Sequence, residues 1–483
     1  MAIETGDDYV DSLRGRGLRV LYKGEWIDEP VDHPVIRPSI AAVAMTYDLA
    51  REHPELATAE SSIAGRRVNR FLHVTESAAD VVAQNHMQRR LGQLTGTCFQ
   101  RCVGMDAFNA LFSVTHDIDD AAGTGYHPRL RAFLRDRQLA NHVVGGAMTD
   151  PKGDRSRGPA DQDDPALFVH VVERRDGGVV IRGAKAHQTG CLNSHWLLVM
   201  PTMRLRAGDE AYAISCAVPV DAPGITYVLG RQASDGRALE GIDQGNATYA
   251  GQEALIVFED VFVPDELVFM DGEVDWAAEL VERFTTYHRR SYVCKTGLGD
   301  VLIGAAAQIA EDNGVPKASH IQDKLVEMAH LNETLYGTGI AASHASTPRP
   351  AGNWEPDPML ANVCKHNVTR FPFELGRLAQ DLAGGLVATG PSDKDLEHPE
   401  VGPLLERLLR AAPGVPTKRR LRVLRLIENM TMGRNAVGYL TESLHGAGSP
   451  QAQRIQIRRM MDVEGKKALA RRLAGVDDDD QSA

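Results

Sequence analysis

Two cysteines, Cys98 and Cys102, stand four residues apart in the stretch TCFQRCVGMDAF, and the 483-residue chain contains only six cysteines. On one helix the two thiols would lie on the same face, close enough to bind one metal centre. Two thiolates are an incomplete site, because zinc or an iron–sulfur cluster usually takes four protein ligands. His288 and Cys294 in YHRRSYVCKTG suggest a second pair. A set of three cysteines and one histidine suits zinc, or an iron–sulfur cluster with one unusual ligand.

Two simpler interpretations of the cysteine pair stay open. Cysteine is among the most buried residue types and often packs as a small hydrophobic side chain. A C-x3-C spacing is also a weaker metal-binding pattern than the paired C-x2-C motifs of zinc sites. A disulfide is disfavoured, because the N-terminus MAIETGDDYVDSL lacks the apolar segment of a signal peptide. We therefore expect a cytoplasmic protein with reduced thiols.

The composition describes a globular protein, with 43% apolar and 24% charged residues. No stretch approaches about 18 uninterrupted apolar residues, so we expect no membrane span. The net charge of −12 argues against a general nucleic-acid or membrane surface. It leaves room for a local basic pocket that binds an anionic ligand.

Two carboxylates stand beside glycines or hydroxyl groups rather than in a charged run. Glu253 lies in YAGQEALIVF and Glu442 lies in YLTESLHGAGSP. Each is a candidate general acid or base. The alternative for each is a hydrogen-bonded structural carboxylate, which is the more frequent role of such a residue.

Polar, glycine-bearing loops flank a predicted hairpin. They are GGAMTDPKGDR, residues 145–155, and GAKAHQTG, residues 183–190. Backbone N–H groups freed by glycine, together with Lys152, Arg155 and Thr189, could hold a phosphate or the edge of a flavin. Ordinary turns are the alternative, since Asp-Pro and Lys-Gly-Asp are common turn sequences.

Two further glycine-rich segments, DLAGGLVATGPS at 381–392 and HGAGSPQAQR at 445–454, lie in a region that otherwise reads as helix. Neither matches a G-x-G-x-x-G or a G-x-x-x-x-G-K-[ST] motif, so a Rossmann dinucleotide site or a P-loop is not supported.

The elements that must position these residues fall into three regions. Apolar residues repeat at three and four between about residues 35 and 140, which predicts helices. Between about 165 and 265 β-branched runs predict strands, with a hairpin turn at Asp176-Gly177-Gly178. After about 276 the helical pattern returns. The pattern predicts an α+β fold with an N-terminal helical domain (1–140), a small antiparallel sheet or barrel (141–275) and a C-terminal helical bundle (276–483).

The clearest single helix is SHIQDKLVEMAHLNETLYG, in the third region. Ser319 and Gln322 have the spacing of a capping box at its N-terminus. Its apolar stripe consists of Ile321, Leu325, Met328, Leu331 and Leu335.

Taken together, these motifs resemble the 4-hydroxybutyryl-CoA dehydratase family. The resemblance runs from about residue 30 to the end of the chain. Its superfamily includes the flavin-dependent 4-hydroxyphenylacetate 3-monooxygenases and has the fold of acyl-CoA dehydrogenases, with a β-barrel as the middle domain. The stretches that carry it include RLGQLTGTCFQRCVGMDAFNALF, GAMTDPKGDR, RGAKAHQTG, AGQEALIVFEDVFVP, YHRRSYVCKTGLGDVLIGAA, RFPFELGRLAQDLAGGL and TESLHGAGSPQAQRI.

The resemblance implies a homotetramer that carries FAD and a [4Fe-4S] cluster in each subunit. It implies the conversion of 4-hydroxybutyryl-CoA, or a similar hydroxyacyl-CoA, to crotonyl-CoA, and the isomerisation of vinylacetyl-CoA, by a radical mechanism. The chemistry of this reaction agrees with a requirement for these cofactors. The β C–H of a saturated acyl-CoA is hardly acidic, so its removal needs a radical or hydride route that a side chain alone cannot supply.

The resemblance also implies roles for individual residues. The cluster ligands would be Cys98, Cys102, Cys294 and His288, and His288 would also be the base for the α-proton. The residues that would line the active site are Tyr292, Lys295, Glu253, Glu442, Gln100 and Thr189. The residues that would bind FAD, the glycine-rich ones across a subunit boundary, are Asp150, Lys152, Asp154, Arg155, Gln188, Thr189, Gly384, Gly385, Gly448 and Ser449.

One interval departs from the family's pattern. Five residues separate His288 from Cys294, where the family has six, and Val293 stands where the family has glycines. The loss of one residue rotates a helical position by about 100°, so Cys294 is predicted either to regain its place by a backbone rearrangement or to point away. This interval motivates an alternative: a flavin-only enzyme of the same superfamily, a two-component aromatic monooxygenase or an isomerase, that has lost the cluster. A non-catalytic scaffold stabilised by zinc or a cluster is the third hypothesis.

Overall fold

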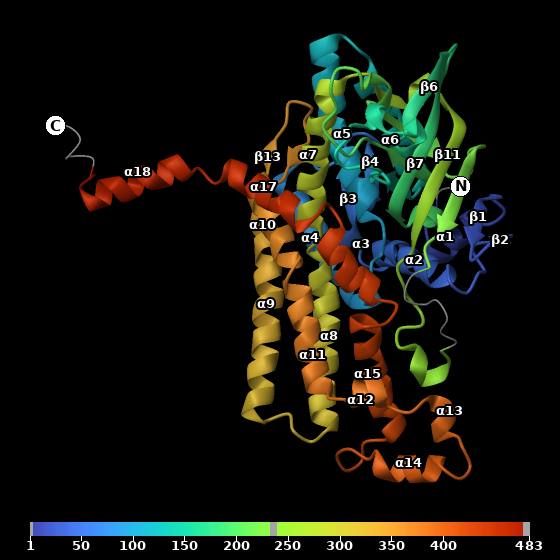
Figure 1. Cartoon of the computed structure of the whole chain (residues 1–483), viewed down its shortest axis with the longest axis vertical. Coiled ribbons are helices and arrows are strands. Elements are labelled where there is room, and N and C mark those ends of the chain that lie inside the picture. The colour runs from blue at the N-terminus through green and yellow to red at the C-terminus, as the bar shows by residue number, and fades with distance from the viewer. Residues whose placement is uncertain (1–2, 232–238, 477–483) are drawn as a thin grey trace.

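The computed structural model describes residues 3–231 and 239–476. Helices dominate both ends of the chain, and strands dominate its middle (Figure 1). The predicted helices between about 35 and 140 are confirmed, although short strands interrupt them. The N-terminal elements are α1 (Gly6–Ser12), β1 (Arg19–Tyr22), β2 (Glu25–Ile27), α2 (Arg37–Glu52), α3 (Pro54–Ala57), β3 (Thr58–Ser61), β4 (Arg66–Asn69), α4 (Ala78–Thr95), α5 (Cys102–Ala122) and α6 (Tyr126–Ala140).

The middle of the chain forms two open sheets rather than a closed barrel. The larger has the order β2-β1-β10-β11-β7-β6 and the smaller has the order β12-β9-β8-β5. Among the described residues neither sheet pairs its first strand with its last, and β1–β10 and β5–β8 are parallel pairs. The prediction of an antiparallel sheet or barrel is therefore corrected to two open, mixed sheets. The strands are β5 (Val144–Ala147), β6 (His170–Arg175), β7 (Gly178–Thr189), β8 (Trp196–Val199), β9 (Ile214–Pro219), β10 (Ile225–Leu229), β11 (Glu253–Pro264) and β12 (Val268–Asp271).

The predicted hairpin is confirmed, because β6 and β7 pair antiparallel with Arg175 opposite Gly178. Gly177 turns the chain with φ +80°, a backbone conformation that glycine adopts without strain. The first strands, β1 and β2, complete the larger sheet from the N-terminal region. Sequence periodicity did not predict this contribution, because the two strands are short and about 200 residues of chain separate them from β10, the strand with which β1 pairs.

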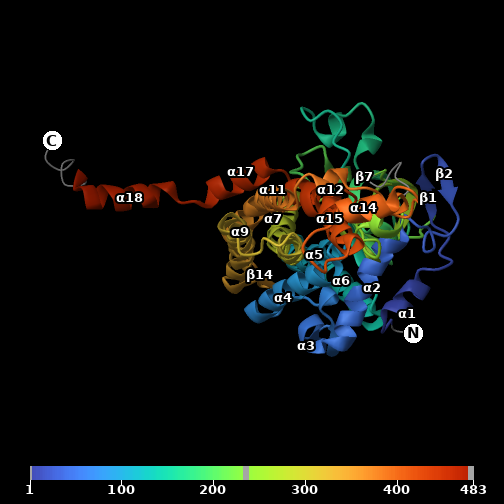
Figure 2. The same cartoon turned by 90° about the horizontal axis from the view of Figure 1, so that it is seen from below.

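The remainder of the chain is a helical bundle with a projecting C-terminal arm (Figures 1 and 2). A second apolar core fills the bundle, separate from the larger core shared by the N-terminal helices and the sheets. The elements are α7 (Val274–Ser291), α8 (Cys294–Asp312), α9 (Ser319–His344), β13 (Thr347–Pro348), β14 (Trp354–Glu355), α10 (Pro358–Val368), α11 (Phe371–Ala383), α12 (Leu386–Thr389), α13 (Asp393–Leu396), α14 (Gly402–Leu408), α15 (Thr417–Thr431), α16 (Glu442–His445), α17 (Pro450–Met460) and α18 (Val463–Ala474).

The predicted helix α9 and its apolar stripe are confirmed, and its predicted cap is wrong. Ile321, Met328 and Leu335 are buried, and they face the bundle. Ser319 is the first helical residue, Ala318 is the N-cap, and no side chain caps the helix. Gln322 instead donates a hydrogen bond to the carbonyl of Pro316, so the residue that should have closed the capping box is used by the preceding turn.

Helices α7 and α8 together, residues 274–312, are long and apolar enough to cross a membrane. Of their most apolar window, 67% is buried inside the protein. The two helices are also separated by a break at Tyr292 and Val293. Both observations describe core helices, and the break places the end of one helix and the start of the next in the interior.

Helix α5 lies directly against strand β5, and a glycine makes this contact possible. A Cβ on Gly104 would stand 1.8 Å from the carbonyl oxygen of Val144. Because that neighbour is backbone, it cannot move aside as a flexible side chain would. The contact sets the position of the first turns of α5, which begins at Cys102.

We predict that Gly104→Ala destabilises the protein by at least about 1–3 kcal/mol, since the added methyl group separates α5 from β5. Thermal unfolding of the purified variant measures the effect. Gly337→Ala on α9 is the matched control, because a Cβ there meets no atom within 4 Å. Equal unfolding temperatures for the two variants would contradict the proposed role of Gly104.

Candidate active site

Cys98 and Cys102 do not share a helix, which corrects the sequence prediction. Helix α4 ends with Gly96 in the left-handed conformation, and Gln100 has φ +61°, so the chain cannot continue as a helix between them. Cys98 lies in the resulting loop, and Cys102 is the first residue of α5. The buried Arg101 fixes this loop, because its guanidinium lies 4.8 Å from the centroid of the Tyr47 ring.

Three thiols from two distant parts of the chain lie together. Burial raises the pKa of the Cys294 thiol to about 11. Burial and the neighbouring Cys294 raise the pKa values of both Cys98 and Cys102 well above the ordinary value, although for Cys98 the Glu442 carboxylate contributes more than Cys294. Cys98 and Cys102 retain some exposed surface, unlike the buried Cys191 and Cys216. These shared electrostatic effects indicate that the shortened interval leaves Cys294 near the other two cysteines.

His288 approaches the same place from the last turn of α7. Its Nδ1 lies 2.8 Å from Oδ2 of Asp106, a buried carboxylate on α5. Its ring stacks on Phe284 at a centroid distance of 5.3 Å and meets the edge of Tyr292, also at 5.3 Å. Asp106 also contributes to the raised pKa values of Cys102 and Cys294, so the imidazole and the thiols share one neighbour.

Among the described residues, no group of three or more His, Cys, Asp or Glu side chains has the compact arrangement that holds a single metal ion. A zinc site needs its ligands within bonding distance of one atom. A cluster of several irons and sulfides occupies more space, so its ligands stand further apart. The cluster ligands that the resemblance implies therefore stay a proposal.

Two carboxylates that are 189 positions apart in the sequence meet beside the thiols. Burial and the adjacent Glu442 raise the pKa of Glu253 well above its ordinary value. The Oε1 atom of Glu442 has no donor among the described residues, while its Oε2 accepts from Lys295 Nζ at 2.7 Å. A protonated Glu253 would supply the missing donor. Thr189 donates to the other face of Glu253, from Oγ1 to Oε1 at 2.8 Å.

Lys295 holds the second carboxylate in place. Burial opposes its charge, but the Glu442 carboxylate and the nearby cysteines keep its pKa well above the ordinary value. Its ammonium group also donates to the carbonyl of Gly438, in the π-helical turn Val437–Thr441. Such turns widen the helix locally and occur mostly at functional sites. The pair is therefore an acid, Glu253, beside a carboxylate, Glu442, that is neutralised by an ammonium group.

Tyr292 lies at the break between α7 and α8, between two lysines. Lys365 Nζ is 4.4 Å and Lys295 Nζ is 5.5 Å from its ring centroid. A Cβ on Gly446 would stand 1.6 Å from the phenolic oxygen of Tyr292, so the glycine of HGAGS provides the space for this group.

Lys365 is a member of the site that sequence reasoning missed. It is fully buried, and it donates to the carbonyl of Ser443. Burial, Lys295 and Arg289 lower its pKa well below the ordinary value. In the sequence it is the one lysine of the segment that forms α10. Asp106 gave a similar signal, as a lone carboxylate in the apolar first turns of α5.

Gln100 forms hydrogen bonds that support the site. Its Nε2 donates to the carbonyl of Ala250 at 3.1 Å, and its Oε1 accepts from Asn193 at 3.1 Å. Its side chain is buried and occupied by these bonds. Gln100 therefore holds the cysteine loop in place and lies beside the predicted active site.

The residues predicted to bind FAD lie in several environments. Asp150 is committed to a buried ion pair with Lys185 at 2.6 Å. Gln188 accepts from the backbone N–H of Met148 at 3.0 Å, which ties β7 to the 148–155 loop. Asp154 accepts from the backbone N–H of Ser156 and closes a turn.

The remaining residues predicted to bind FAD are more accessible to a ligand. Lys152 Nζ lies 3.4 Å from Thr202 Oγ1, and Arg155 is exposed. Gly448 and Ser449 are exposed beside Arg289, whose guanidinium would contact a Cβ on Gly448 at 3.3 Å. Gly384 and Gly385 are exposed at the end of α11, near α15 rather than near the thiols.

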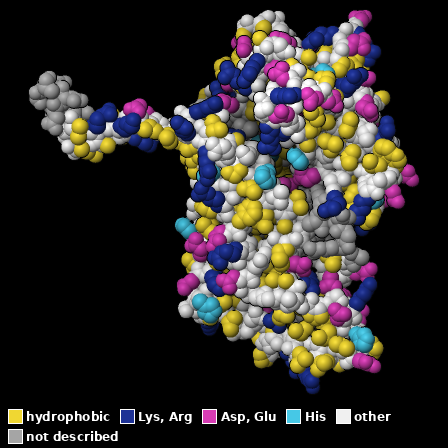
Figure 3. Space-filling model, in the orientation of Figure 1, with side chains coloured by type: hydrophobic (Ala, Val, Ile, Leu, Met, Phe, Trp, Pro, Cys, Tyr) yellow, Lys and Arg dark blue, Asp and Glu magenta, His cyan; other side chains and the backbone are white. Residues whose placement is uncertain are grey.

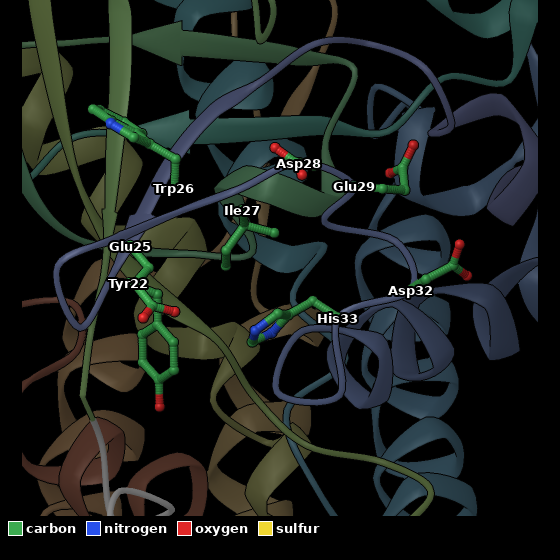
Figure 4. Close-up of a pocket in the computed structure, with 8 residues that line it drawn as sticks. All are labelled: Tyr22, Glu25, Trp26, Ile27, Asp28, Glu29, Asp32 and His33. Carbon is green, nitrogen blue, oxygen red and sulfur yellow. The ribbon is translucent and has the colours of Figure 1, made fainter.

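A pocket of about 370 Å³ opens beside the β1–β2 hairpin (Figure 4). Its acidic side chains are surface groups, and Asp32 already pairs with Arg14 at 2.7 Å. None of the predicted site residues lines it, so we do not assign chemistry to it. Its lining residues are Tyr22, Glu25, Trp26, Ile27, Asp28, Glu29, Asp32 and His33.

The chain belongs to the 4-hydroxyphenylacetate 3-hydroxylase family. Residues 5–270 match the family described as "4-hydroxyphenylacetate 3-hydroxylase N terminal", and residues 277–475 match its C-terminal counterpart. Within that family, the chain is 51% identical to the 4-hydroxybutyryl-CoA dehydratase/vinylacetyl-CoA-Delta-isomerase of Clostridium aminobutyricum, over 98% of this chain and 99% of the relative. The resemblance predicted from the sequence is confirmed.

Solved structures agree with this placement. An oxygen-tolerant archaeal 4-hydroxybutyryl-CoA dehydratase from N. maritimus is 63% identical, with a TM-score of 0.97 over 98% of this chain and 95% of that one. The FAD-complexed oxygenase component of 4-hydroxyphenylacetate 3-monooxygenase shares the fold, with a TM-score of 0.86 at 24% identity over 97% of this chain and 98% of that one. The fold is thus a mixed α/β fold with helical N- and C-terminal regions.

We predict that Glu253→Gln stabilises the protein and impairs its reaction. Glutamine can still donate a hydrogen bond to Glu442 and accept one from Thr189. Its amide group does not titrate, so it does both at any pH. Because the pKa of Glu253 is raised in the folded state, its carboxyl group costs stability at every pH above its unfolded value of about 4.5. The gain in unfolding temperature should therefore grow as the pH rises from about 4.5 towards neutrality.

Turnover of this variant should fall about 10²- to 10⁴-fold, the usual effect of losing a general acid. Glu259→Gln is the control, because Glu259 lies on the same strand and is exposed. A variant at Glu253 that is less stable than wild type at neutral pH would show that the carboxyl group is ionised in the folded protein.

Proposed function

We propose that this chain is an acyl-CoA dehydratase. It would convert 4-hydroxybutyryl-CoA, or a similar hydroxyacyl-CoA, to crotonyl-CoA, and it would isomerise vinylacetyl-CoA. The observation that carries the proposal is the nearly full-length identity of 51% to a dehydratase of that name. The constellation of thiols, imidazole, paired carboxylates and lysines at one buried place supports it.

The proposed cofactors are a [4Fe-4S] cluster and FAD. Cys98, Cys102, Cys294 and His288 would hold the cluster, and the free Nε2 side of His288 fits that assignment. Lys152, Arg155, Gly448 and Ser449 are accessible to FAD, and the Thr189 hydroxyl, which donates to Glu253, could still accept from it. Asp150, Asp154 and Gln188 would act through the loop that they hold. The FAD complexes of relatives with the same fold are consistent with a flavin.

The bound cofactors would supply the one-electron chemistry that an unactivated β C–H requires, together with a Lewis acid for the substrate oxygen. The chain's own groups would handle protons. Glu253 would hold a proton at its carboxyl group for a departing hydroxyl group. Glu442, fixed by Lys295, would remain a carboxylate that can accept a proton. Tyr292 would orient the substrate between the two lysines. His288 is the proposed base for the α-proton, a role that its Nε2 could fill only while that nitrogen does not bind iron.

The alternative is a flavin-only enzyme of the same family, as the shortened His288–Cys294 interval suggested. The convergence of Cys294 with Cys98 and Cys102 favours the cluster over this alternative. The third hypothesis, a non-catalytic scaffold stabilised by zinc or a cluster, is disfavoured by the nearly full-length identity to an enzyme.

The C-terminal arm supports the proposed homotetramer. Helix α18 extends away from the rest of the chain (Figures 1 and 2), and no residue of it is buried. Leu469 is 55% exposed and Leu473 is 82% exposed, one helical turn apart. Apolar side chains are visible along this arm in Figure 3. A second copy of the chain would cover them.

Two further expectations remain part of the proposal. The order of helices, strands and helices is the one expected for an acyl-CoA dehydrogenase-like arrangement, with domains at 1–140, 141–275 and 276–483. The cysteines all have free thiols, which agrees with the expected cytoplasmic location.

The first experiment measures iron, acid-labile sulfide and flavin in protein purified without oxygen, together with the conversion of 4-hydroxybutyryl-CoA. We expect about four irons and one FAD per chain, as the proposed cofactors require. Flavin without iron, in fully active protein, would establish the flavin-only alternative. Protein that binds no flavin after reconstitution would exclude both enzymes.

We further predict that Cys98→Ala lowers the iron content and leaves FAD bound, because the thiol is a proposed cluster ligand and does not belong to a flavin loop. Cys216→Ala is the matched control, since Cys216 is a buried free thiol on β9. Iron and flavin analysis of both variants measures the effect. An iron content in Cys98→Ala equal to that of the control would remove Cys98 from the ligand set.

A further inference from the structure

Asp106 is a fully buried carboxylate on α5 that is not among the predicted site residues. Its two oxygens have different partners on α7. Oδ2 lies 2.8 Å from Nδ1 of His288, and Oδ1 accepts from Ser291 Oγ at 2.9 Å. The carboxylate therefore connects two helices at the point where α7 ends.

The nearest buried cation is not the main partner of this carboxylate. Arg290 Nη2 lies 3.7 Å from Asp106, beyond hydrogen-bonding distance. The guanidinium donates instead to Asn85 Oδ1 and Gln84 Oε1 on α4, each at 2.8 Å. The hydrogen bonds of Asp106 are thus directed to His288 and Ser291, while Arg290 contributes charge alone.

The bond to His288 determines which ring nitrogen carries the hydrogen. A carboxylate oxygen accepts, so Nδ1 of the imidazole must donate. In the neutral ring the lone pair then lies on Nε2. In the described part of the chain the only polar contact of the ring is the one at Nδ1, and the side chain keeps 11% of its surface exposed. Nε2 is free for a ligand or a proton.

The same helix also carries a proposed ligand. Cys102 is the first residue of α5, and Asp106 follows one helical turn later on the same face. The Gln88 side chain donates to the sulfur of Cys102 at 3.2 Å. Helix α5 thus holds one thiol directly and could orient the imidazole through its carboxylate, with Gly104 between them fixing the helix against β5.

We propose that Asp106 is a positioning residue that fixes the ring orientation and tautomer of His288, so that Nε2 is presented to the iron–sulfur cluster. This inference rests on the proposed function, since the cluster is its object. Carboxylates that accept from the second nitrogen of a ligating histidine typically change metal affinity or activity by about 10- to 100-fold when they are removed.

The test compares Asp106→Ala, Asp106→Asn and wild type as full-length, cofactor-loaded proteins. The readouts are iron content, turnover and the Mössbauer spectrum of protein enriched in the active iron isotope. In that spectrum an iron bound by histidine differs from irons bound by thiolate. Asp312→Asn is the matched control, because Asp312 is equally buried but pairs with Arg419 elsewhere in the bundle.

We expect Asp106→Ala to lose the distinct iron signal and to lower turnover about 10- to 100-fold. Asparagine can still accept from Nδ1 and donate to Ser291, so Asp106→Asn should keep the signal in altered form with an intermediate turnover. The control should keep the wild-type spectrum. An iron-replete Asp106→Ala with the wild-type spectrum overturns the inference and leaves the proposed function intact.

If Asp106→Ala does not fold, a second variant without an acceptor is needed. Asp106→Leu, which is close in shape to the asparagine variant but cannot accept from Nδ1, then takes the place of the alanine variant, and a wild-type spectrum and turnover in folded Asp106→Leu would overturn the inference. Wild-type protein that contains no iron would overturn both the proposed function and this inference.

Discussion

Ionisable groups that are shut away from water must be satisfied by one another, and this constraint shapes the interior between the helices and the sheets. Lys295 can stay charged there only because Glu442 lies 2.7 Å away. Glu442 in turn has one oxygen left over, which Glu253 can satisfy only while it holds a proton. A buried charge without a partner would cost several kcal/mol. The protonation states at this place are therefore set together rather than one by one.

These groups lie where regular secondary structure is interrupted. Cys98 lies in a loop that a left-handed glycine and Gln100 force out of the helix. Tyr292 lies at the break between α7 and α8, and Glu442 follows a π-helical turn. Regular helices satisfy their own backbone groups, whereas breaks leave carbonyls such as that of Gly438 free to accept from a lysine. The chemistry is concentrated where regular hydrogen bonding stops.

Much of the fold could be predicted from local pattern. The hairpin at Asp176-Gly177-Gly178 and helix α9 depend on turn chemistry and apolar periodicity, which act over a few residues. The capping box at Ser319 failed because a neighbouring turn captured Gln322. The closed barrel failed because closure depends on which strands end beside one another, and the larger sheet recruits β1 from the far N-terminus instead.

The sequence by itself determined which chemically capable residues the chain has and which family it resembles, since motifs and composition are properties of the linear chain. It singled out Glu253, Glu442, His288 and the three cysteines without showing what lies beside each one. Only the tertiary structure placed Glu253 beside Glu442, Cys294 near the other two cysteines, and Asp106 within hydrogen-bonding distance of His288. The physical reason is that pKa values, hydrogen-bond partners and tautomers depend on distances of a few ångströms, and such distances between residues far apart in sequence exist only after packing.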